Sequence, residues 1–247
     1  VEGRGRAGTV WGRWDARGVD LTGQLAAPLA PWTSGALDGD AVAFVRLTGP
    51  PGRAAASLTA RAYGITVGTA AGAARPYRVD RAVLEARYQG GRWTLLDLRA
   101  ERDPGGRLHV TGSGPPWDLT VQARGVRLPE EVAAAGALGL SGRADFLGTL
   151  TGSADEPRLA GELAVADGTL FGQPFERARG FVELGAEGVN FRRVWIVRAD
   201  ESYRLAGAVG PAPPSGPRPF SVDLELVDGR AEVLWAALGW DVPVQGR

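Results

Sequence analysis

The feature that most limits how this chain can fold is the alternation of apolar and polar side chains along short stretches. In Phe220–Leu226, Phe, Val and Leu alternate with Ser, Asp and Glu. A period of two is that of a β-strand, in which successive side chains point to opposite faces. The pattern recurs in Trp117–Gln122, Leu159–Val165 and Ala82–Arg87. We therefore predict an all-β protein whose strands each carry one apolar face.

Glycine, proline and aspartate separate these stretches and mark the predicted turns. The clearest turn signals are Gln89–Gly91, Asp103–Gly106, Asp167–Gly168 and Asp228–Gly229. Because the strands are short and consecutive, we expect neighbours to pair antiparallel. Both faces of Val194–Val197 are apolar, so the sequence does not assign its phase.

A second regularity is a repeat of about a hundred residues. Gly39, Gly142 and Gly246 lie 103 and then 104 residues apart, and each follows a short apolar segment. Two of these segments, Glu130–Leu138 and Ala231–Leu238, are expected to form brief closing helices. Internal repeats of this kind are typical of arrays in which each unit contacts mainly its neighbours. We predict residues 1–39 as the end of a preceding unit, 40–142 as one unit and 143–247 as another, in a fragment of a longer chain.

Composition excludes several classes of function. The 28 basic and 28 acidic side chains balance, whereas a nucleic-acid-binding protein usually carries a basic surplus. There is no Cys, which excludes disulfides, thiolate catalysis and Cys-ligated metal sites. The longest apolar run, Val132–Leu140, is too short to span a bilayer as a helix, and no signal peptide is visible at Val1.

Motifs for catalysis or metal binding are scarce. Gly3–Gly8 fits the G-x-G-x-x-G pattern, but no predicted strand precedes it and no convincing helix follows. His109 is the single histidine and belongs to a strand, on the face opposite Leu108 and Val110. The acidic pairs Asp38/Asp40 and Asp155/Glu156 read as turns. We therefore expect no catalytic residue, no metal site and no cofactor.

The eight Trp residues raise a different possibility. Trp11, Trp14 and Trp93 could form stacking platforms for a sugar, as in a glycan-binding module. Trp117 instead aligns with Phe220 on a predicted apolar face, and packing is the common role of such rings. A glycan-binding module stays open as an alternative function.

The last predicted unit resembles a known family. Its glycine and leucine pattern runs through Gly142–Gly152, Glu156–Gly161, Ala166–Phe175 and Leu205–Gly207. This progression resembles the repeats of the TamB and AsmA-like family of bacterial envelope proteins. The resemblance covers about 100 residues well and the rest more loosely.

That family implies a long β-sheet curled lengthwise into an open trough, the β-taco, with an apolar interior. It also implies transport of phospholipid between the inner and outer membranes through the periplasm. The full-length protein would be anchored in the inner membrane, with an outer-membrane barrel partner in members that assemble outer-membrane proteins. The family has no catalytic residues.

The predicted binding site is the apolar face itself, which would contact phospholipid acyl chains. Charged residues such as Arg81, Glu162, Asp223 and Glu225 lie on the opposite face of the strands and would keep that side soluble. The alternative to a conduit is a structural spacer or adhesin whose apolar face is sealed in a dry core. The predicted acyl-chain contacts are Leu84, Leu96, Leu98, Leu119, Val121, Leu163, Val165, Val182, Leu184, Phe220, Val222, Leu224 and Leu226.

Overall fold

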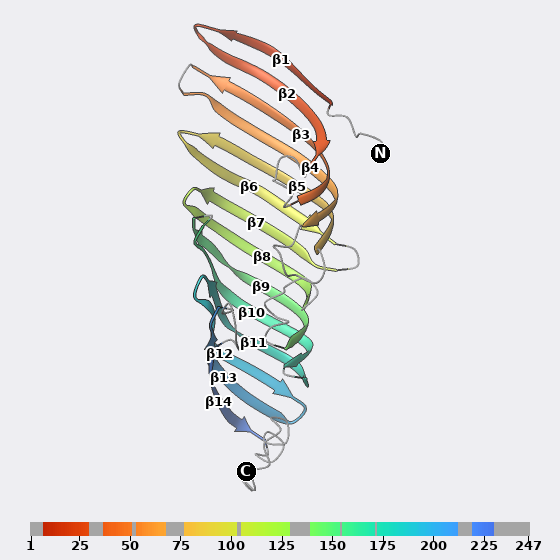
Figure 1. Cartoon of the computed structure of the whole chain (residues 1–247), viewed down its shortest axis with the longest axis vertical. Helices are drawn as coiled ribbons and strands as arrows, with labels where there is room; N and C mark the ends of the chain where they lie inside the picture. Colours follow the sequence, from red (N-terminus) through yellow and green to blue (C-terminus); the bar gives the residue numbers. More distant parts are fainter. Residues whose placement is uncertain are drawn as a thin grey trace. The chain divides into compact units, whose positions relative to one another are not determined.

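The computed structural model of the chain is built from strands that form one antiparallel sheet. It describes residues 7–29, 37–50, 53–67, 77–102, 105–128, 139–153, 155–170, 172–211 and 219–229. Within these residues the fold is all-β, and fourteen strands follow one another across the sheet in chain order (Figure 1). Neither edge strand pairs with the other, so the sheet is not closed into a barrel. The prediction of an all-β protein with an open antiparallel sheet is confirmed.

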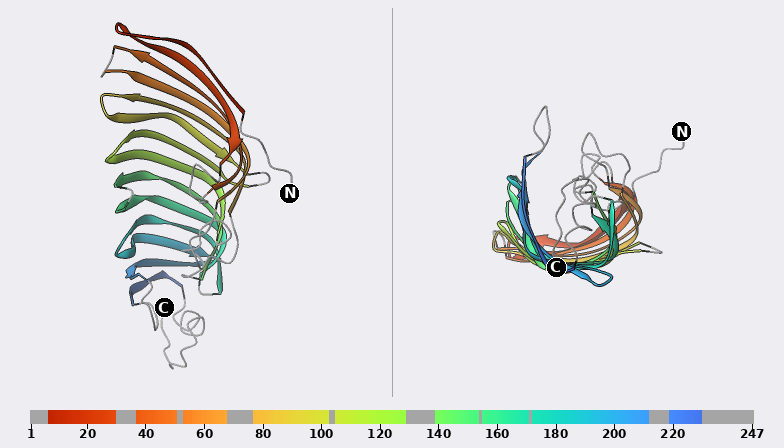
Figure 2. Two further views of the ribbon diagram at one scale, coloured as in Figure 1. Left: turned by 45° about the horizontal axis from the view of Figure 1, so that its top comes forward. Right: turned by 90° about the horizontal axis from the view of Figure 1, so that it is seen from below.

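The chain divides into two compact units. Unit 1 comprises residues 1–123 and 151–153, and unit 2 comprises residues 124–150 and 154–247. The strands are β1 Ala7–Asp15, β2 Gly18–Pro28, β3 Leu37–Gly49, β4 Ala55–Val67, β5 Tyr77–Gln89, β6 Arg92–Glu101, β7 Arg107–Gly114, β8 Trp117–Leu128, β9 Leu140–Gly152, β10 Pro157–Leu170, β11 Gln173–Gly185, β12 Gly188–Arg198, β13 Glu201–Val209 and β14 Phe220–Asp228. Figure 2 shows that the strands bend along their length in each unit.

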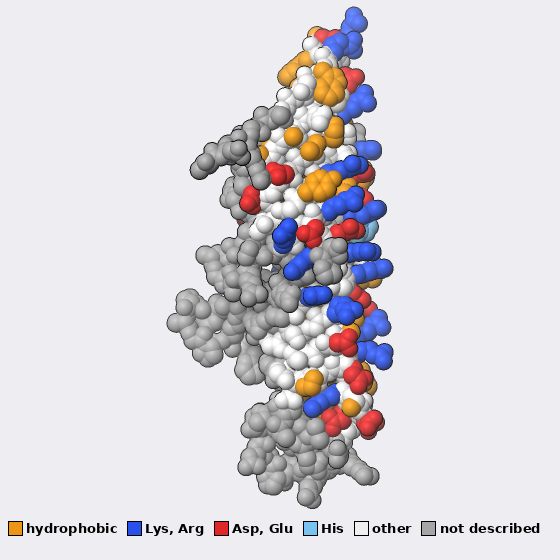
Figure 3. Space-filling model, turned by 90° about the vertical axis from the view of Figure 1, so that its right-hand side faces the viewer, with side chains coloured by type: hydrophobic (Ala, Val, Ile, Leu, Met, Phe, Trp, Pro, Cys, Tyr) orange, Lys and Arg blue, Asp and Glu red, His pale blue; other side chains and the backbone are white. Residues whose placement is uncertain are grey.

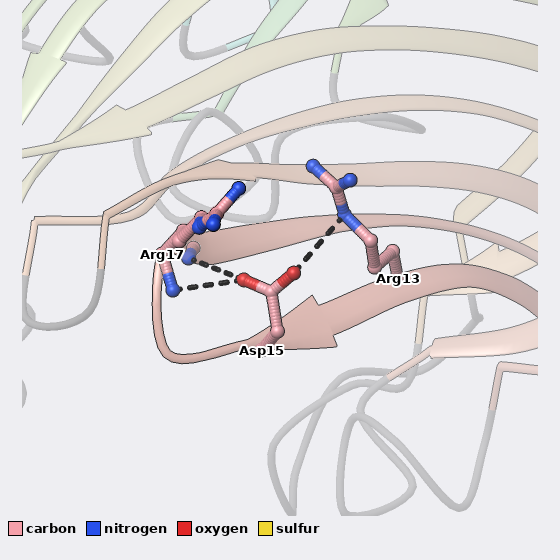
Figure 4. A network of polar contacts seen from close by, with 4 residues as sticks. Arg13, Asp15 and Arg17 are labelled. Carbon is pink, nitrogen blue, oxygen red and sulfur yellow. Dashed lines mark hydrogen bonds and ion pairs between the residues drawn. The ribbon is translucent and has the colours of Figure 1, made fainter.

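Short turns with local hydrogen bonds connect several neighbouring strands. Between β1 and β2, Asp15 Oδ1 accepts hydrogen bonds from the backbone N–H of Arg17 at 2.8 Å and of Gly18 at 3.2 Å (Figure 4). The other carboxylate oxygen lies 3.4 Å from Nε of Arg13. An aspartate that binds the backbone two residues ahead is a turn-forming element. The predicted turn at Gly90–Gly91 likewise joins β5 to β6.

Two predicted turns are instead irregularities inside strands. Asp167–Gly168 lies within β10, which runs without a break to Leu170, and Asp167 has a φ of 51°. Asp38–Asp40 lies within β3, where the register against β4 shifts. Asp and Gly tolerate left-handed backbone, and β-bulges use this tolerance as turns do. The prediction of turns there was wrong because one residue pattern serves both structures.

Bulges also decide the strand phase that the sequence left open. In β12 the register shifts between Phe191 and Val194, so these two residues share a face although they are three positions apart. Val194 and Ile196 then lie on the face of Phe191, and Trp195 lies on the other. An extra residue in a strand reverses the alternation beyond it.

The strand pattern of β3–β8 recurs in β9–β14. β3 and β9 both have 13 residues and begin at Leu37 and Leu140, and β5 and β11 both have 13 residues. Close backbone approach recurs as well, because an added Cβ would lie 2.1 Å from a facing carbonyl oxygen at both Gly112 and Gly207. These correspondences support a repeat of six strands. The repeat boundaries after residues 39 and 142 stay predictions, and each falls three residues into a strand.

The two expected closing helices, Glu130–Leu138 and Ala231–Leu238, lie outside the described residues. Among the residues that are described, no helix is long and apolar enough to cross a membrane.

Candidate ligand-binding face

The strand register sorts the side chains of unit 1 onto two chemically distinct faces. Residues that pair directly across neighbouring strands point to the same side of a sheet. One side carries apolar residues from β2 to β7, and we call it the apolar face of unit 1. Its central rows consist of Gly23, Leu25, Ala27, Ala41, Ala43, Val45, Leu58, Ala60, Ala62, Ala82, Leu84, Ala86, Leu95, Leu98, Ala100, Leu108, Val110 and Gly112.

One row of this face consists of alanines. They face each other in register over five neighbouring strands, β2 to β6. Strands in a sheet lie about 4.8 Å apart, so the row extends for roughly 19 Å across the strands. Its small side chains leave the surface low compared with the flanking rows. The row is Ala27, Ala41, Ala62, Ala82 and Ala100.

The opposite face, which we call the polar face of unit 1, carries its charged side chains together with the exposed rings of Trp11, Phe44 and Tyr63. On this face Asp97 lies between two basic side chains. Its Oδ2 is 3.1 Å from Nη2 of Arg99, and its Oδ1 is 3.0 Å from Nε2 of His109. Arg46 and Asp20 lie 3.4 Å apart on the same side. In Figure 3 arginines (blue) and acidic side chains (red) project from one edge of the surface, with the two signs intermixed. Since the two signs are intermixed, this polar face carries no strong overall charge.

Unit 2 has the same two faces, but its apolar face is more completely filled. Its strands place a contiguous cluster of buried residues on one side, which we call the apolar face of unit 2. Val222, Leu226 and other half-buried residues pack against this cluster. The buried members are Leu128, Ala144, Val165, Phe175, Ala178, Phe191, Ile196, Tyr203, Leu205 and Val209.

Aromatic rings in unit 2 lie against glycines of the neighbouring strands. Gly148 and Gly161 face each other, and a Cβ added at either would lie within 2.8 Å of the tip of the Phe146 ring. A Cβ added at Gly168 would lie 2.5 Å from the Phe175 ring. Each ring therefore fills the space that a side chain would take. The rings lie along the sheet instead of standing up from it, which keeps the apolar surface even.

The apolar faces are less exposed than the polar ones. No buried polar or charged residue occurs among the described residues, whereas Ala144 and Val165 are only 4% exposed. Side chains on the inside of a bent sheet crowd together, and those on the outside spread apart. We therefore infer that the apolar face of each unit lines the inside of its bend (Figure 2).

Tyr203 is the titratable member of the buried cluster of unit 2. Its hydroxyl donates a hydrogen bond to Oε2 of Glu201, the first residue of β13. Burial, together with this hydrogen bond, raises the pKa of Tyr203 to about 12. The phenol therefore stays neutral at physiological pH and adds no charge to the apolar face.

The structure brings most of the predicted acyl-chain contacts onto the apolar faces. Cross-strand pairs place Leu84 opposite Leu98, Leu159 opposite Leu184, and Leu205 opposite Leu224. Leu119 is buried between the exposed Asp118 and Thr120, and Val121 after them is half-buried. The backbone of Phe220 pairs with Val209. The remaining predicted residues on these faces are Leu163, Val165, Val182, Val222 and Leu226.

Leu96 is the exception among the predicted contacts. It lies in a bulge of β6 between Leu95 and Leu98, outside the pairing with both neighbouring strands, and is 46% exposed. Strict alternation puts Leu96 and Leu98 on one face. Because of the bulge, Leu95 and Leu98 share the apolar face, and Leu96 does not belong to it.

Sequence reasoning missed several central residues of these faces. Ala62, Ile65 and Val79 form the buried cluster of unit 1, and Phe191 and Ile196 belong to that of unit 2. Ile65 follows an irregularity of β4 at Gly64, whose φ is 58°, and pairs with Val79 of β5. The pattern Ala62-x-x-Ile65 was the available signal, because a spacing of three between buried residues marks a bulge.

The three tryptophans proposed as sugar platforms are divided between the two faces. Trp11 pairs with Thr22 on the polar side of β1, whereas Trp14 pairs with Val19 on the opposite side. Trp93 of β6 pairs with Tyr88 on the side of Ala86 and Leu95, and the ring centroids of Tyr88 and Trp93 are 5.1 Å apart. Glycan binding stays a prediction.

The described residues offer no cluster of three or more His, Cys, Asp or Glu side chains that could hold a metal ion. What the geometry offers to a ligand is therefore a broad apolar surface on each unit, backed by a charged outer face. Comparisons of the chain with protein-family models, with curated proteins and with solved structures find no match.

Proposed function

We propose that the chain is a non-enzymatic segment of a lipid conduit, in which the apolar faces shield phospholipid acyl chains from water. The observation that carries this proposal is an open sheet with one apolar face in each unit and no buried polar or charged group among the described residues. Such a surface suits a ligand that makes no directional contacts. The resemblance to TamB and AsmA-like repeats supports the same function.

The energetics favour this use of an apolar face. Exposing one methylene to water costs about 0.8 kcal/mol, so a chain of about fifteen costs on the order of 12 kcal/mol. A surface without polar groups lowers that cost along its length. Alanines in unit 1 and rings packed over glycines in unit 2 offer an acyl chain apolar contacts without directional partners.

The family resemblance suggests the cellular setting. We place the proposed conduit in the periplasm of a bacterial envelope, between the inner and outer membranes. Anchoring in the inner membrane and contact with an outer-membrane barrel would be supplied by other parts of a longer protein. Assembly of outer-membrane proteins is a further role that the family resemblance suggests.

A first experiment asks whether the purified chain carries lipid. Solvent extraction followed by mass spectrometry should recover phospholipid, and delipidated protein should take up a fluorescent fatty acid. A spacer or adhesin with a sealed core would yield neither. Recovery of no lipid together with no uptake of the probe would overturn the proposal.

A second experiment tests which face binds. Leu84 and Glu85 are neighbours on β5 that point to the apolar and the polar face of unit 1. A photoreactive phenylalanine analogue at position 84 should label bound phospholipid, and the same group at position 85 should not. Equal labelling at both positions would mean that lipid adheres without regard to the face.

A further inference from the structure

A hollow on the polar face of unit 2 is distinct from the apolar faces. It has a volume of about 660 Å³ and lies over β10, β11 and β12. Register shifts in the pairing of β11 with β12 and of β12 with β13 fall beside it. Its side-chain lining consists of Glu162, Arg179, Phe181, Arg192, Arg193 and Trp195.

The charges in this lining do not balance. Three arginines face a single carboxylate, Glu162, whose Oε2 lies 2.7 Å from Nη2 of Arg179. Arg192 pairs with Glu183, and its guanidinium lies 5.4 Å from the centroid of the Phe181 ring. Among the residues that the structure describes, Arg193 has no ion pair or hydrogen bond from its side chain. The exposed guanidinium of Arg193 thus lies unpaired beside those of Arg179 and Arg192, which ion pairs hold in place.

The bulge itself does not require two arginines. It keeps Phe191 and Val194 on the apolar face, and β6 achieves the same for Leu95 and Leu98 with Leu96 and Asp97. Asp97 of β6 is satisfied by Arg99 and His109. Arg193 occupies the corresponding place in β12, with a φ of 52°. A non-glycine residue in the left-handed region is uncommon and costs free energy, and Asp167 and Ala199 of unit 2 share this conformation with Arg193.

We propose that this hollow is a binding site for a phosphate group. Guanidinium groups bind phosphate oxygens through pairs of parallel N–H donors, and arginine is the preferred residue for that geometry. Arg193 supplies the free charge, while Arg179 and Arg192 are held beside it by Glu162 and Glu183. The site takes a phosphate monoester, carried by a lipid headgroup or by a soluble molecule. It does not depend on the apolar faces or on the conduit.

The first test titrates the purified chain with inorganic phosphate by calorimetry at about 0.15 M salt, where long-range attraction between charges is screened. Arg193→Asn should weaken binding by about ten- to a hundred-fold, because the phosphate loses hydrogen bonds from a charged group. Asn tolerates left-handed backbone, so the bulge should persist. The matched control, Arg61→Asn, removes an exposed arginine from the polar face of unit 1 and should leave binding unchanged.

A second variant distinguishes a loss of phosphate binding from a loss of folding. Arg192→Leu with Arg193→Asp copies into β12 the two residues that β6 carries in its own bulge. This variant should fold, as judged by circular dichroism, and should bind no phosphate. Binding that survives in it, or that Arg61→Asn weakens equally, would overturn the proposal.

Vesicles distinguish the two sources of the phosphate. The chain is mixed with vesicles of phosphatidylcholine that contain or lack phosphatidic acid, whose headgroup is a phosphate monoester. Binding to phosphatidic acid that is lost with Arg193→Asn assigns the site to a lipid headgroup. Binding of inorganic phosphate alone assigns it to a soluble molecule. If neither probe binds in a manner that depends on Arg193, the hollow is not a phosphate site.

Discussion

The apolar faces of units 1 and 2 follow one strand pattern but are filled to different degrees. In unit 1 the row through Ala62 contains only alanines from β2 to β6. The corresponding row of unit 2 contains Val165, Ala178, Ile196 and Tyr203 on consecutive strands. Among the described residues the buried clusters differ accordingly, with three residues in the cluster of unit 1 and ten in that of unit 2.

This difference shows that the strand pattern and the volume of the inward side chains vary independently. Alternation fixes which residues point inward, and their size fixes how much of the inside the protein itself occupies. Unit 2 uses larger side chains and flat-lying rings to bury its own apolar surface. Unit 1 leaves the surface lower. If an acyl chain binds, unit 1 has the more accessible floor and unit 2 the more stable one.

The largest expected effect concerns two residues at corresponding places. Phe191 of β12 pairs with Gly207, and Leu95 of β6 pairs with Gly112. Phe191→Ala should lower the free energy of unfolding by about 3–5 kcal/mol, since it empties a buried site. Leu95→Ala, at a half-buried site, should cost about half as much. Denaturant unfolding of both variants checks this, and equal costs would contradict the contrast between the units.

The next prediction fills the floor of unit 1. Ala27→Leu with Ala41→Leu, at half-buried positions of the alanine row, should weaken binding of a fluorescent fatty acid roughly ten-fold, because about two methylenes of contact are lost. Stability should change little on an open face, whereas overpacking of a sealed core costs about 1–3 kcal/mol. Thr59→Leu with Glu85→Leu on the polar face is the control. Unfolding with no effect on binding would favour the dry core.

A smaller difference between the units is expected in how their stability changes at alkaline pH. The pKa of Tyr203 is raised from 10.0 to about 12, so the neutral phenol stabilises the fold below pH 10. That contribution is lost as the pH rises from 10 to 12, and we expect about 1 kcal/mol after allowance for solvent screening. Tyr203→Phe should remove this part of the alkaline loss of stability. The corresponding residue of unit 1 is Leu108, which cannot titrate.

The smallest effects are expected among the ion pairs of the polar faces. Arg204 and Glu225 lie 3.0 Å apart in unit 2, and the Glu225 side chain is 62% exposed. A double-mutant cycle should give about 0.2–0.5 kcal/mol for this pair. Asp97 in unit 1 is only 20% exposed, so its pair with Arg99 should give more. The reverse order would show that exposure does not set these energies.

Much of the fold could be predicted from the sequence, and the failures share one cause. Alternation alone placed Leu84, Leu163 and Leu224 with their neighbours, because a regular strand has only two faces. It failed at Leu96 and left Val194–Val197 undecided, since each lies at or beyond a bulge. A bulge is defined by two residues facing one on the neighbouring strand, so it does not exist until the strands pair.

The candidate sites divide in the same way. The apolar face could be expected from periodicity, because the driving force that buries it is proportional to area and needs no exact geometry. The arginine hollow could not, since Glu162, Arg179 and Arg193 belong to three strands and meet only across the register of β10, β11 and β12.

The amino-acid sequence by itself determined the β-strands, their antiparallel succession and the existence of one apolar face, because these follow from local alternation and turn chemistry. The tertiary structure alone decided the register, the bulges and therefore which side chains meet. These depend on pairing between strands, and a shift of one residue in that pairing sends every following side chain to the other face.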